Sequence, residues 1–398
     1  MNNEKTIGIA IVGCGQIVTH HCKALSQIQN VSVRALCDPS KERRDVIHQL
    51  CEQYQLIEQK QTTLTQYHSL QELLHDQTNI ENCDLIFIAV PHDLHVSIAC
   101  QALDAGKHVL MEKPLAPTME ECHTLQKASQ QSKGFLLIAE QSPYWQEIEK
   151  AKEMLSSKEN AIGSLITAAS YYYESMRDNV TSGLTDDGGL GWRCSLKKCG
   201  GGIVIDGGLH WIRPLRELCG DITSVIGVKQ NCQLGLKMEG ETLAHALFKI
   251  RNKYYSPNCD NHNIDNKDGN IEELVATYSA NMMHTAPMCH DAAPYFRLTG
   301  TKGELIIPGT GLNPNGGGGL RLYNETYPNG HDLFPTDRQG GFFLGFQGLW
   351  KEMLRIIKTE DRDAAHRSVR NAAADVALVL ALYKSSESGQ WEKCELFD

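Results

Sequence analysis

The sequence predicts two domains: a doubly wound α/β domain at the N-terminus, followed by an α+β domain with a largely antiparallel sheet. Three observations lead to this prediction. The chain has 398 residues, which exceeds the usual size of a single domain. Short apolar runs alternate with helix-like segments over residues 1–140, which is typical of a parallel sheet. Over residues 141–398, strand-like runs mostly follow one another, which is typical of antiparallel pairing.

In the first domain, five short apolar runs rich in β-branched residues predict buried parallel strands. They are IGIAIVG (7–13), VSVRALCD (31–38), DLIFIAV (84–90), HVLMEK (108–113) and FLLIAE (135–140). Polar-patterned segments between them have helical apolar spacing, for example KERRDVIHQLCEQY (41–54) and HVSIACQALDAG (95–106).

In the second domain, WQEIEKAKEMLSS (145–157) predicts a helix, and several strand-like runs follow it. The predicted strands are ITAASYYYES (166–175), SVIGVKQN (224–231), ALFKI (246–250), LVATYSANM (274–282), YFRLTG (295–300) and GELIIPG (303–309). Two segments with helical periodicity, 348–358 and 369–383, close this domain.

Composition excludes several classes of function. A formal net charge of -10 argues against a nucleic-acid or anionic-membrane partner, and 41% hydrophobic residues are enough for sizeable cores. The N-terminus lacks the pattern of a signal peptide, and the 14 cysteines are scattered without a C-x-x-C pair, so we expect reduced thiols in the cytoplasm. No further ligand pattern supports His284 and His290 as a metal pair, so we expect no metal site.

The first predicted strand runs into GCGQIV, which has the first two glycines of a dinucleotide-binding fingerprint. Gly13 permits a tight turn, and Gly15 lets a pyrophosphate approach the backbone. The helix that begins near Gln16 and Ile17 presents its N-terminal amides to the anion. The second strand ends in Asp38, 25 residues after Gly13, where an acidic residue commonly binds the adenosine ribose. These features predict a Rossmann-type domain.

The carboxylate at Asp38 favours NAD as the cofactor, because it would repel the 2′-phosphate of NADP. Ser40, Arg43 and Arg44 follow closely and can offset that repulsion, so NADP stays possible.

Residues 200–215, GGGIVIDGGLHWIRPL, hold one carboxylate, Asp206, and one imidazole, His210. Four residues make one helical turn, so in an α-helix the two side chains lie on one face. Taken alone, the stretch fits a capped core helix with a satisfied histidine as well as an acid/base pair. We interpret the triple glycine, 200–202, as a turn that lets the backbone approach substrate and cofactor.

The motifs, taken in order along the chain, resemble the glucose-fructose oxidoreductase, inositol dehydrogenase and MocA family of two-domain dehydrogenases. The matching features are GCGQI with His21, the segment 91–95, Glu112-Lys113-Pro114, Trp192-Arg193, the triple glycine with D-x-x-x-H, FRLTGTKGELII and the final YKSSESGQW. They run almost from one end of the chain to the other.

The resemblance implies that Lys113, Asp206 and His210 are catalytic. Histidine is suited to remove the hydroxyl proton as hydride passes to the nicotinamide, and Asp206 would orient it. Lys113, at the end of a parallel strand, would position the alcohol oxygen or the nicotinamide ribose. The resemblance also implies cofactor contacts from Pro91, His95, Glu112 and Lys113, and subunit contacts through the open sheet, as a homo-oligomer of two or four chains.

Two departures from the family pattern concern the site. His92 stands where asparagine is common, and Arg213-Pro214 follows His210 where an aspartate and an apolar residue are usual. Pro214 cannot donate a hydrogen bond to the carbonyl of His210, so we expect a kinked helix with that carbonyl free, and a change in specificity rather than in reaction type.

Candidate substrate contacts are two pairs, Tyr144 with Trp145 and Trp192 with Arg193. Aromatic faces and a guanidinium suit a polyhydroxylated ring, and they suit core packing equally well.

The leading hypothesis is therefore an NAD(P)-dependent dehydrogenase or reductase acting on a sugar, a cyclitol or a related cyclic alcohol. A regulatory protein that binds dinucleotide without catalysis is a second hypothesis, although it would not need Lys113, Asp206 and His210. A glycosidase that retains NAD and oxidises the sugar only transiently is a third.

Overall fold

The computed structural model describes residues 5–57, 64–157, 159–175, 191–232, 238–255, 272–284, 295–308, 319–334 and 341–397. These residues form two compact units, one built from residues 1–140 and 346–373, and the other from residues 141–345 and 374–398. The predicted division put residues 346–373 in the second domain. In the structure they pack with the first unit, and the division between the units falls within the long helix α12 (Arg362–Ser388).

The first unit contains a six-stranded, wholly parallel sheet. Its strands are β1 (Ile7–Val12), β2 (Val31–Cys37), β3 (Thr65–Tyr67), β4 (Leu85–Ile88), β5 (His108–Glu112) and β6 (Leu136–Ala139). Its helices are α1 (Ile17–Leu25), α2 (Lys41–Gln53), α3 (Leu70–His75), α4 (Gln77–Glu81), η1 (His92–Leu94), α5 (His95–Asp104) and α6 (Met119–Gln131), with most of α11 (Gly341–Thr359). The predicted doubly wound fold is confirmed.

The strand order, β3-β2-β1-β4-β5-β6, reverses direction between β1 and β4. Ligands of open α/β sheets bind at such a switch point, beyond the carboxyl ends of the strands. The turn after β1, Asp38 after β2, the segment after β4 and Lys113 after β5 all lie at this edge of the sheet. The topology therefore gathers segments from four strands that the sequence analysis associated with the cofactor.

The second unit contains a nine-stranded mixed sheet, in which only β7 and β10 pair in parallel among the described strands. The strands are β7 (Leu165–Ser175), β8 (Ile222–Gln230), β9 (Leu243–Arg251), β10 (Glu273–His284), β11 (Phe296–Gly300), β12 (Gly303–Ile307), β13 (Arg321–Asn324), β14 (His331–Asp332) and β15 (Glu392–Lys393). Helical segments are η2 (Ser142–Tyr144), α7 (Gln146–Ser156), η3 (Gly191–Cys194), α9 (Leu196–Cys199), η4 (Val204–Gly208) and α10 (Leu209–Cys219).

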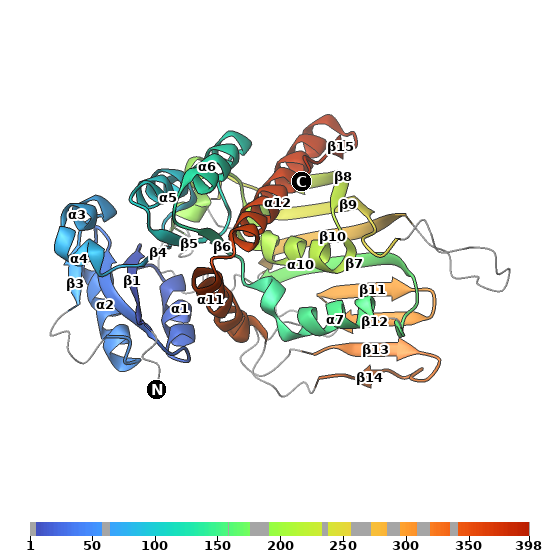
Figure 1. Cartoon of the computed structure of the whole chain (residues 1–398). Coiled ribbons are helices and arrows are strands. Elements are labelled where there is room, and N and C mark those ends of the chain that lie inside the picture. The colour runs from blue at the N-terminus through green and yellow to red at the C-terminus, as the bar shows by residue number, and fades with distance from the viewer. Residues whose placement is uncertain are drawn as a thin grey trace. The chain divides into compact units, whose positions relative to one another are not determined.

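Helices α7 and α10 and the C-terminal part of α12 cover one face of this sheet (Figure 1). Burial alternates along the strands accordingly: in β9, Ala244, Ala246, Phe248 and Ile250 are buried, while His245 and Leu247 between them are exposed. The predicted open and largely antiparallel sheet is confirmed. The short strands β3, β14 and β15 were not predicted, because they have only two or three residues and no apolar run.

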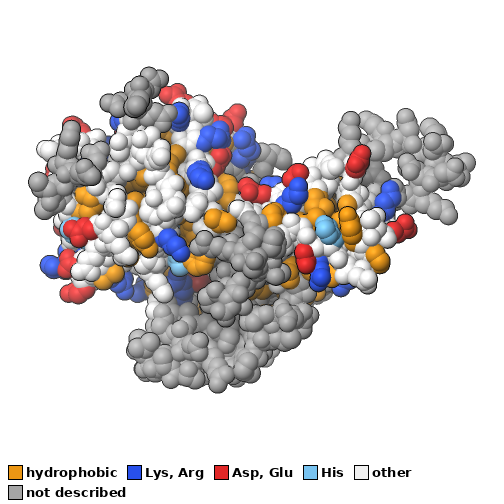
Figure 2. Space-filling view, turned by 90° about the horizontal axis from the view of Figure 1, so that it is seen from below, with side chains coloured by type: hydrophobic (Ala, Val, Ile, Leu, Met, Phe, Trp, Pro, Cys, Tyr) orange, Lys and Arg blue, Asp and Glu red, His pale blue; other side chains and the backbone are white. Residues whose placement is uncertain are grey.

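The surface carries charges of both signs. Figure 2 shows Lys and Arg interspersed with Asp and Glu on the face that it presents, rather than gathered into stripes of one sign. Within the part of the chain that the structure describes, no helix is long and apolar enough to cross a membrane.

Candidate active site

The turn after β1 requires glycine at Gly13 and leaves open space at Gly15. Gly13 has a φ of +87°, and a Cβ there would lie 2.2 Å from the carbonyl oxygen of Ala89, so a side chain fits neither the conformation nor the space. Among the described residues, a Cβ at Gly15 would meet no atom within 4 Å apart from those of its chain neighbours. The backbone at Gly15, at the start of α1, is thus open to a pyrophosphate, as the fingerprint predicts. Gln16 is exposed and Ile17 half-buried at this helix start.

Asp38 stands at the predicted ribose position, and its carboxylate also forms hydrogen bonds that stabilise this turn. Its Oδ2 accepts a hydrogen bond from the amide of Cys14 at 2.8 Å, and its Oδ1 accepts one from the amide of Ser40 at 2.8 Å. Arg44 donates to the carbonyl oxygen of Asp38 and, through Nε, to Gln66 at 3.2 Å. The Arg44 side chain therefore has partners within the domain, which weakens the argument that it offsets repulsion of a 2′-phosphate.

A buried chain of hydrogen bonds leads from helix α11 to Lys113. The indole nitrogen of Trp350 donates to Nδ1 of His21 at 3.0 Å, and Nε2 of His21 lies 2.8 Å from Oε1 of Glu112. Oε2 of Glu112 accepts the amide of Lys113 at 3.2 Å. An indole N–H can only donate, so Nδ1 of His21 is the acceptor and Nε2 carries the proton given to Glu112.

This chain makes Glu112 and His21 supports of the Lys113 backbone. Lys113 is half-buried at the end of β5 and is joined to Pro114 by a cis peptide bond. The hydrogen bonds of Glu112 hold the local structure, and the cofactor contact that the resemblance implies for it stays a prediction. Pro91, just after β4, is half-buried at the same edge of the sheet.

His95 is fully buried, with both ring nitrogens close to backbone carbonyls. Nδ1 lies 2.9 Å from the oxygen of Pro114 and Nε2 lies 3.1 Å from that of Val90. Burial lowers the pKa of His95, although the two carbonyls oppose that effect. His95 thus braces the peptide after Lys113 from inside the domain.

In the second unit, Asp206 lies in the π-helical turn η4 and His210 lies at the start of α10. The sequence analysis assumed one continuous α-helix, whereas the structure has a π-to-α junction between the two residues. Such π-turns occur often at functional sites. Nε of Arg193 donates to Oδ2 of Asp206 at 2.9 Å, and the Arg193 guanidinium lies 4.6 Å from the ring centroid of Trp192. Arg193 and Trp192, the second pair of predicted substrate contacts, therefore lie beside Asp206.

Two glycines in the turn allow tyrosines of the sheet to contact its backbone. A Cβ at Gly207 would lie 2.2 Å from the hydroxyl oxygen of Tyr172 on β7, and one at Gly208 would lie 2.3 Å from that of Tyr278 on β10. Both tyrosines are buried. The turn that contains Asp206 therefore packs directly against two strands, β7 and β10.

Two residues of the triple glycine allow close contacts within the second unit. A Cβ at Gly201 would lie 2.3 Å from the hydroxyl oxygen of Tyr383, and one at Gly202 would lie 2.0 Å from the carbonyl oxygen of Glu241. These two glycines thus permit a close approach within the protein's own chain, and the approach to substrate and cofactor stays a prediction. Glu241 was not identified from the sequence, because a single carboxylate ahead of a strand carries no motif.

Arg213 faces helix α12. Its Nε donates to Oδ2 of Asp375 at 2.7 Å, and Arg216 donates to Oδ1 of the same carboxylate at 2.6 Å. Only 6% of Arg213, 9% of Arg216 and 3% of Asp375 is exposed, so this is a buried ionic cluster. The departure at Arg213 is thus explained by packing of α10 against α12. Helix α10 continues through Pro214, and the irregular turn lies before His210 rather than after it.

Trp145, the other predicted aromatic contact, belongs to the core. It is fully buried, it donates its indole N–H to Oε1 of Gln141, and its ring meets that of Trp211 edge to face at 6.1 Å. A ring in this position has no surface for a substrate, so that prediction is replaced by the packing alternative. Tyr144 is half-buried and stays a candidate.

Among the described residues, no group of three or more His, Cys, Asp and Glu could hold a metal ion. His290, one member of the histidine pair considered above, lies outside the described residues.

Comparison with known proteins agrees with this architecture. Residues 7–140 match the description "Oxidoreductase family, NAD-binding Rossmann fold", and residues 148–306 match "GFO/IDH/MocA C-terminal domain". The aldose-aldose oxidoreductase from Caulobacter crescentus, solved with glycerol, superimposes with a TM-score of 0.71 at 19% identity, covering 98% of this chain and 100% of that one. A levoglucosan dehydrogenase, solved with NADH and levoglucosan, has a TM-score of 0.69 at 16% identity, with 98% and 100% covered.

Curated relatives match over shorter stretches. A glycosyl hydrolase family 109 protein from Shewanella pealeana is 23% identical over 172 residues, which are 43% of this chain and 36% of the relative. The 1-carboxy-3-chloro-3,4-dihydroxycyclohexa-1,5-diene dehydrogenase of Comamonas testosteroni is 36% identical over 74 residues, 19% of each chain. The matched stretches thus span about a third or less of these relatives.

The Rossmann unit with its open glycine turn and the mixed-sheet unit define a two-domain, NAD-binding oxidoreductase. The family matches cover most of both units, and the chain belongs to the GFO/IDH/MocA oxidoreductase family, as the sequence motifs indicated.

Proposed function

We propose that the protein transfers hydride between NAD and a secondary alcohol or ketone of a sugar, a cyclitol or a related cyclic polyol. The observation that carries this proposal is the placement of Asp206 and His210 at a π-to-α junction, where the aspartate also binds Arg193. NAD, when bound, accepts or supplies the hydride. The two domains would divide the work, the first binding NAD and the second binding substrate.

Each proposed catalytic group has a distinct task. His210 takes the proton of the substrate hydroxyl during oxidation and returns it during reduction. Asp206 orients the imidazole and stabilises its protonated form. The Lys113 ammonium holds the alcohol oxygen or the nicotinamide ribose, and Asp38 accepts from the adenosine ribose. We retain Tyr144, Trp192 and Arg193 as candidate substrate contacts.

The test is a screen of the purified protein with NAD and with NADP against sugars and cyclitols, following absorbance of the reduced cofactor. We expect turnover with NAD, and we expect His210→Ala and Lys113→Ala to abolish it while cofactor binding stays largely intact. Full activity in either variant removes that residue from the mechanism.

A glycosidase that retains NAD is the second candidate, because several of the matched relatives are glycosyl hydrolase family 109 proteins. Such an enzyme would release an aryl leaving group from a nitrophenyl glycoside without net formation of NADH. A dehydrogenase would accumulate NADH without cleaving the glycoside, so one experiment distinguishes the two proposed functions.

We further propose that the protein forms a homo-oligomer through the uncovered face of its second sheet. Three adjacent strands, β8, β9 and β10, expose large apolar side chains there: Val228 is 60% exposed, Leu247 41% and Val275 45%. The expected assembly is a dimer or a tetramer of this chain, which places these side chains out of water.

Light scattering after size exclusion tests the assembly. Leu247→Arg should yield monomers, whereas the control Val46→Arg, at a 54% exposed position on α2 in the first unit, should not. A monomeric wild-type protein at micromolar concentration would contradict the proposal. The described cysteines are reduced thiols and most of them are buried, which supports a reducing cytoplasmic location.

A further inference from the structure

Glu241 lies in the turn before β9 and is 5% exposed. It makes contact with the segment that leads into η4, the turn that carries Asp206. We propose that Glu241 is a positioning residue, which anchors the start of η4 and thereby fixes Asp206 and, beyond it, His210. This inference rests on the proposed function for the roles of those two residues.

Three consecutive backbone amides donate hydrogen bonds to this one residue. Gly202 N donates to Oε2 of Glu241 at 2.9 Å, and Val204 N donates to Oε1 at 3.0 Å. Between them, Ile203 N donates to the backbone oxygen of Glu241 at 3.0 Å. The first amides of a helix have no partner within the helix, and a negative charge there is favoured by the helix dipole. Glu241 therefore caps η4 from a distant part of the chain.

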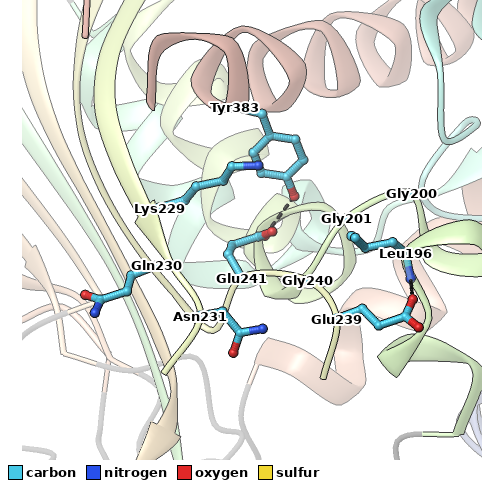
Figure 3. Close-up of a pocket in the computed structure, with 10 residues that line it drawn as sticks. All are labelled: Leu196, Gly200, Gly201, Lys229, Gln230, Asn231, Glu239, Gly240, Glu241 and Tyr383. Atoms are coloured by element: carbon cyan, nitrogen blue, oxygen red, sulfur yellow. Dashed lines mark hydrogen bonds between the residues drawn. The ribbon is translucent and has the colours of Figure 1, made fainter. Parts of the chain in front are cut away.

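The hydroxyl of Tyr383, on α12, adds a further donor, at 2.7 Å from Oε1 (Figure 3). Every group that faces the Glu241 side chain in these bonds is thus a donor, a pattern that suits a carboxylate, which accepts at both oxygens. Burial raises the pKa of Glu241, and these donors oppose the rise. A glutamine has nearly the same shape, but its amide nitrogen would face an N–H group.

Two glycines bring the backbone of the two chain segments close together at the anchor. A Cβ at Gly240 would lie 2.5 Å from the Cα of Gly202, and one at Gly202 would lie 2.0 Å from the Glu241 carbonyl oxygen. The two chain segments are therefore in direct contact through glycines. A cavity of about 260 Å³ opens beside them, lined in part by Lys229, Glu239 and Tyr383. When the anchor fails, the turn has space into which it can move.

Asp206 follows Val204 by two residues in the same turn, so a displaced turn start displaces the carboxylate. Misplacement of a catalytic group by about 1 Å can cost about 100-fold in rate. We therefore expect Glu241→Gln to lower kcat on the order of 10- to 100-fold. The dissociation constant for NAD should stay unchanged, because the predicted NAD contacts lie in the other unit.

The matched control is Glu239→Gln. Glu239 is a glutamate two residues away, and its Oε2 accepts the amide of Leu196 at 2.8 Å, but it is exposed and bonds α9 rather than η4. We expect it to leave kcat unchanged. Glu241→Asp keeps an acceptor-only group on a shorter side chain, so it should restore kcat partly and exceed Glu241→Gln. If the side chain only filled volume, glutamine would be the better replacement, and that ranking would overturn the proposal.

Hydrogen exchange of the whole protein, followed by mass spectrometry, tests the anchor without turnover. Peptides covering residues 202–210 should exchange faster in Glu241→Gln, but not in Glu239→Gln. Unchanged exchange there refutes the anchor, and so does a kcat that stays at the wild-type level in folded Glu241→Gln. If the wild-type protein turns over no polyol, the hydride-transfer proposal fails by itself, and the anchor is still decided by exchange.

Discussion

Replacing Asp375 by asparagine should destabilise the second unit strongly. Asp375 is the shared acceptor of Arg213 and Arg216, which come from α10 and are at most 9% exposed. Removing the carboxylate leaves two guanidinium groups with a neutral partner in a buried place. Breaking a buried ion pair in this way costs about 3–5 kcal/mol.

Two further variants grade the effect. Arg213→Met leaves Asp375 with Arg216, so its cost should be smaller than that of Asp375→Asn. Asp221→Asn removes another partner of Arg216, at 3.1 Å, but the Asp221 side chain is 55% exposed. An exposed pair contributes at most about 1 kcal/mol, so this variant is the control.

The assay is equilibrium unfolding in urea, followed by tryptophan fluorescence and by far-ultraviolet circular dichroism. Two compact units need not unfold together, so the transitions are compared by midpoint at unchanged slope. A midpoint for Asp375→Asn that equals the midpoint for Asp221→Asn would refute the reasoning, because the cluster would then contribute no more than a surface pair.

Three other predictions follow. Gly15→Ala should leave the unfolding midpoint unchanged, since its Cβ would meet no atom of the described residues within 4 Å apart from its chain neighbours. It should weaken NAD binding at least about 10-fold by calorimetry, because the methyl group would occupy the predicted pyrophosphate position. Trp350→Phe removes the N–H group that donates to Nδ1 of His21, and it should lower the free energy of unfolding in urea by about 1–3 kcal/mol. An unchanged unfolding midpoint would contradict the assigned tautomer of His21. Burial lowers the pKa of His95 and His108 below the ordinary value of 6.5, so as the pH drops these histidines take up protons first in the unfolded chain. The free energy of unfolding should therefore fall between about pH 6.5 and pH 5, and a free energy that does not change with pH there would contradict this prediction.

The sequence predicted those parts of the fold whose cause is local. Residues 7–13 and 31–38 are apolar runs with turns at their ends, and they become β1 and β2 with Gly13 and Asp38 where expected. Strand β3 was not predicted, because its three residues, TQY, are too few to show the alternation of apolar and polar side chains that indicates a strand. The π-helical turn η4 was not predicted either. The sequence GGGIVIDGGLHW does not distinguish a π-helical turn from an α-helical one until the packing of Tyr172 and Tyr278 is known.

The structure separates the residues that we propose for the chemistry from the residues that hold them in place. The first kind lie in short motifs, and a single sequence shows them. The second kind come from far along the chain: Trp350 is 329 residues from His21, and Asp375 is 162 residues from Arg213. No local pattern selects such a partner, because its only requirement is to be a donor or an acceptor at the right place in space.

This separation also bears on Arg213-Pro214, for which the sequence predicts a change in specificity. Arg213 stands three residues after His210, but its charge is neutralised by a carboxylate of α12, so that prediction rests on Pro214. Relatives with an aspartate at this position lack the guanidinium that Asp375 accepts here, so a change at Arg213 must be read together with Asp375. The same reasoning applies to Glu241 and the triple glycine. In this chain, a substitution near Asp206 or His210 is therefore expected to act on the proposed reaction only when its side chain, and not merely its sequence position, lies in the proposed site.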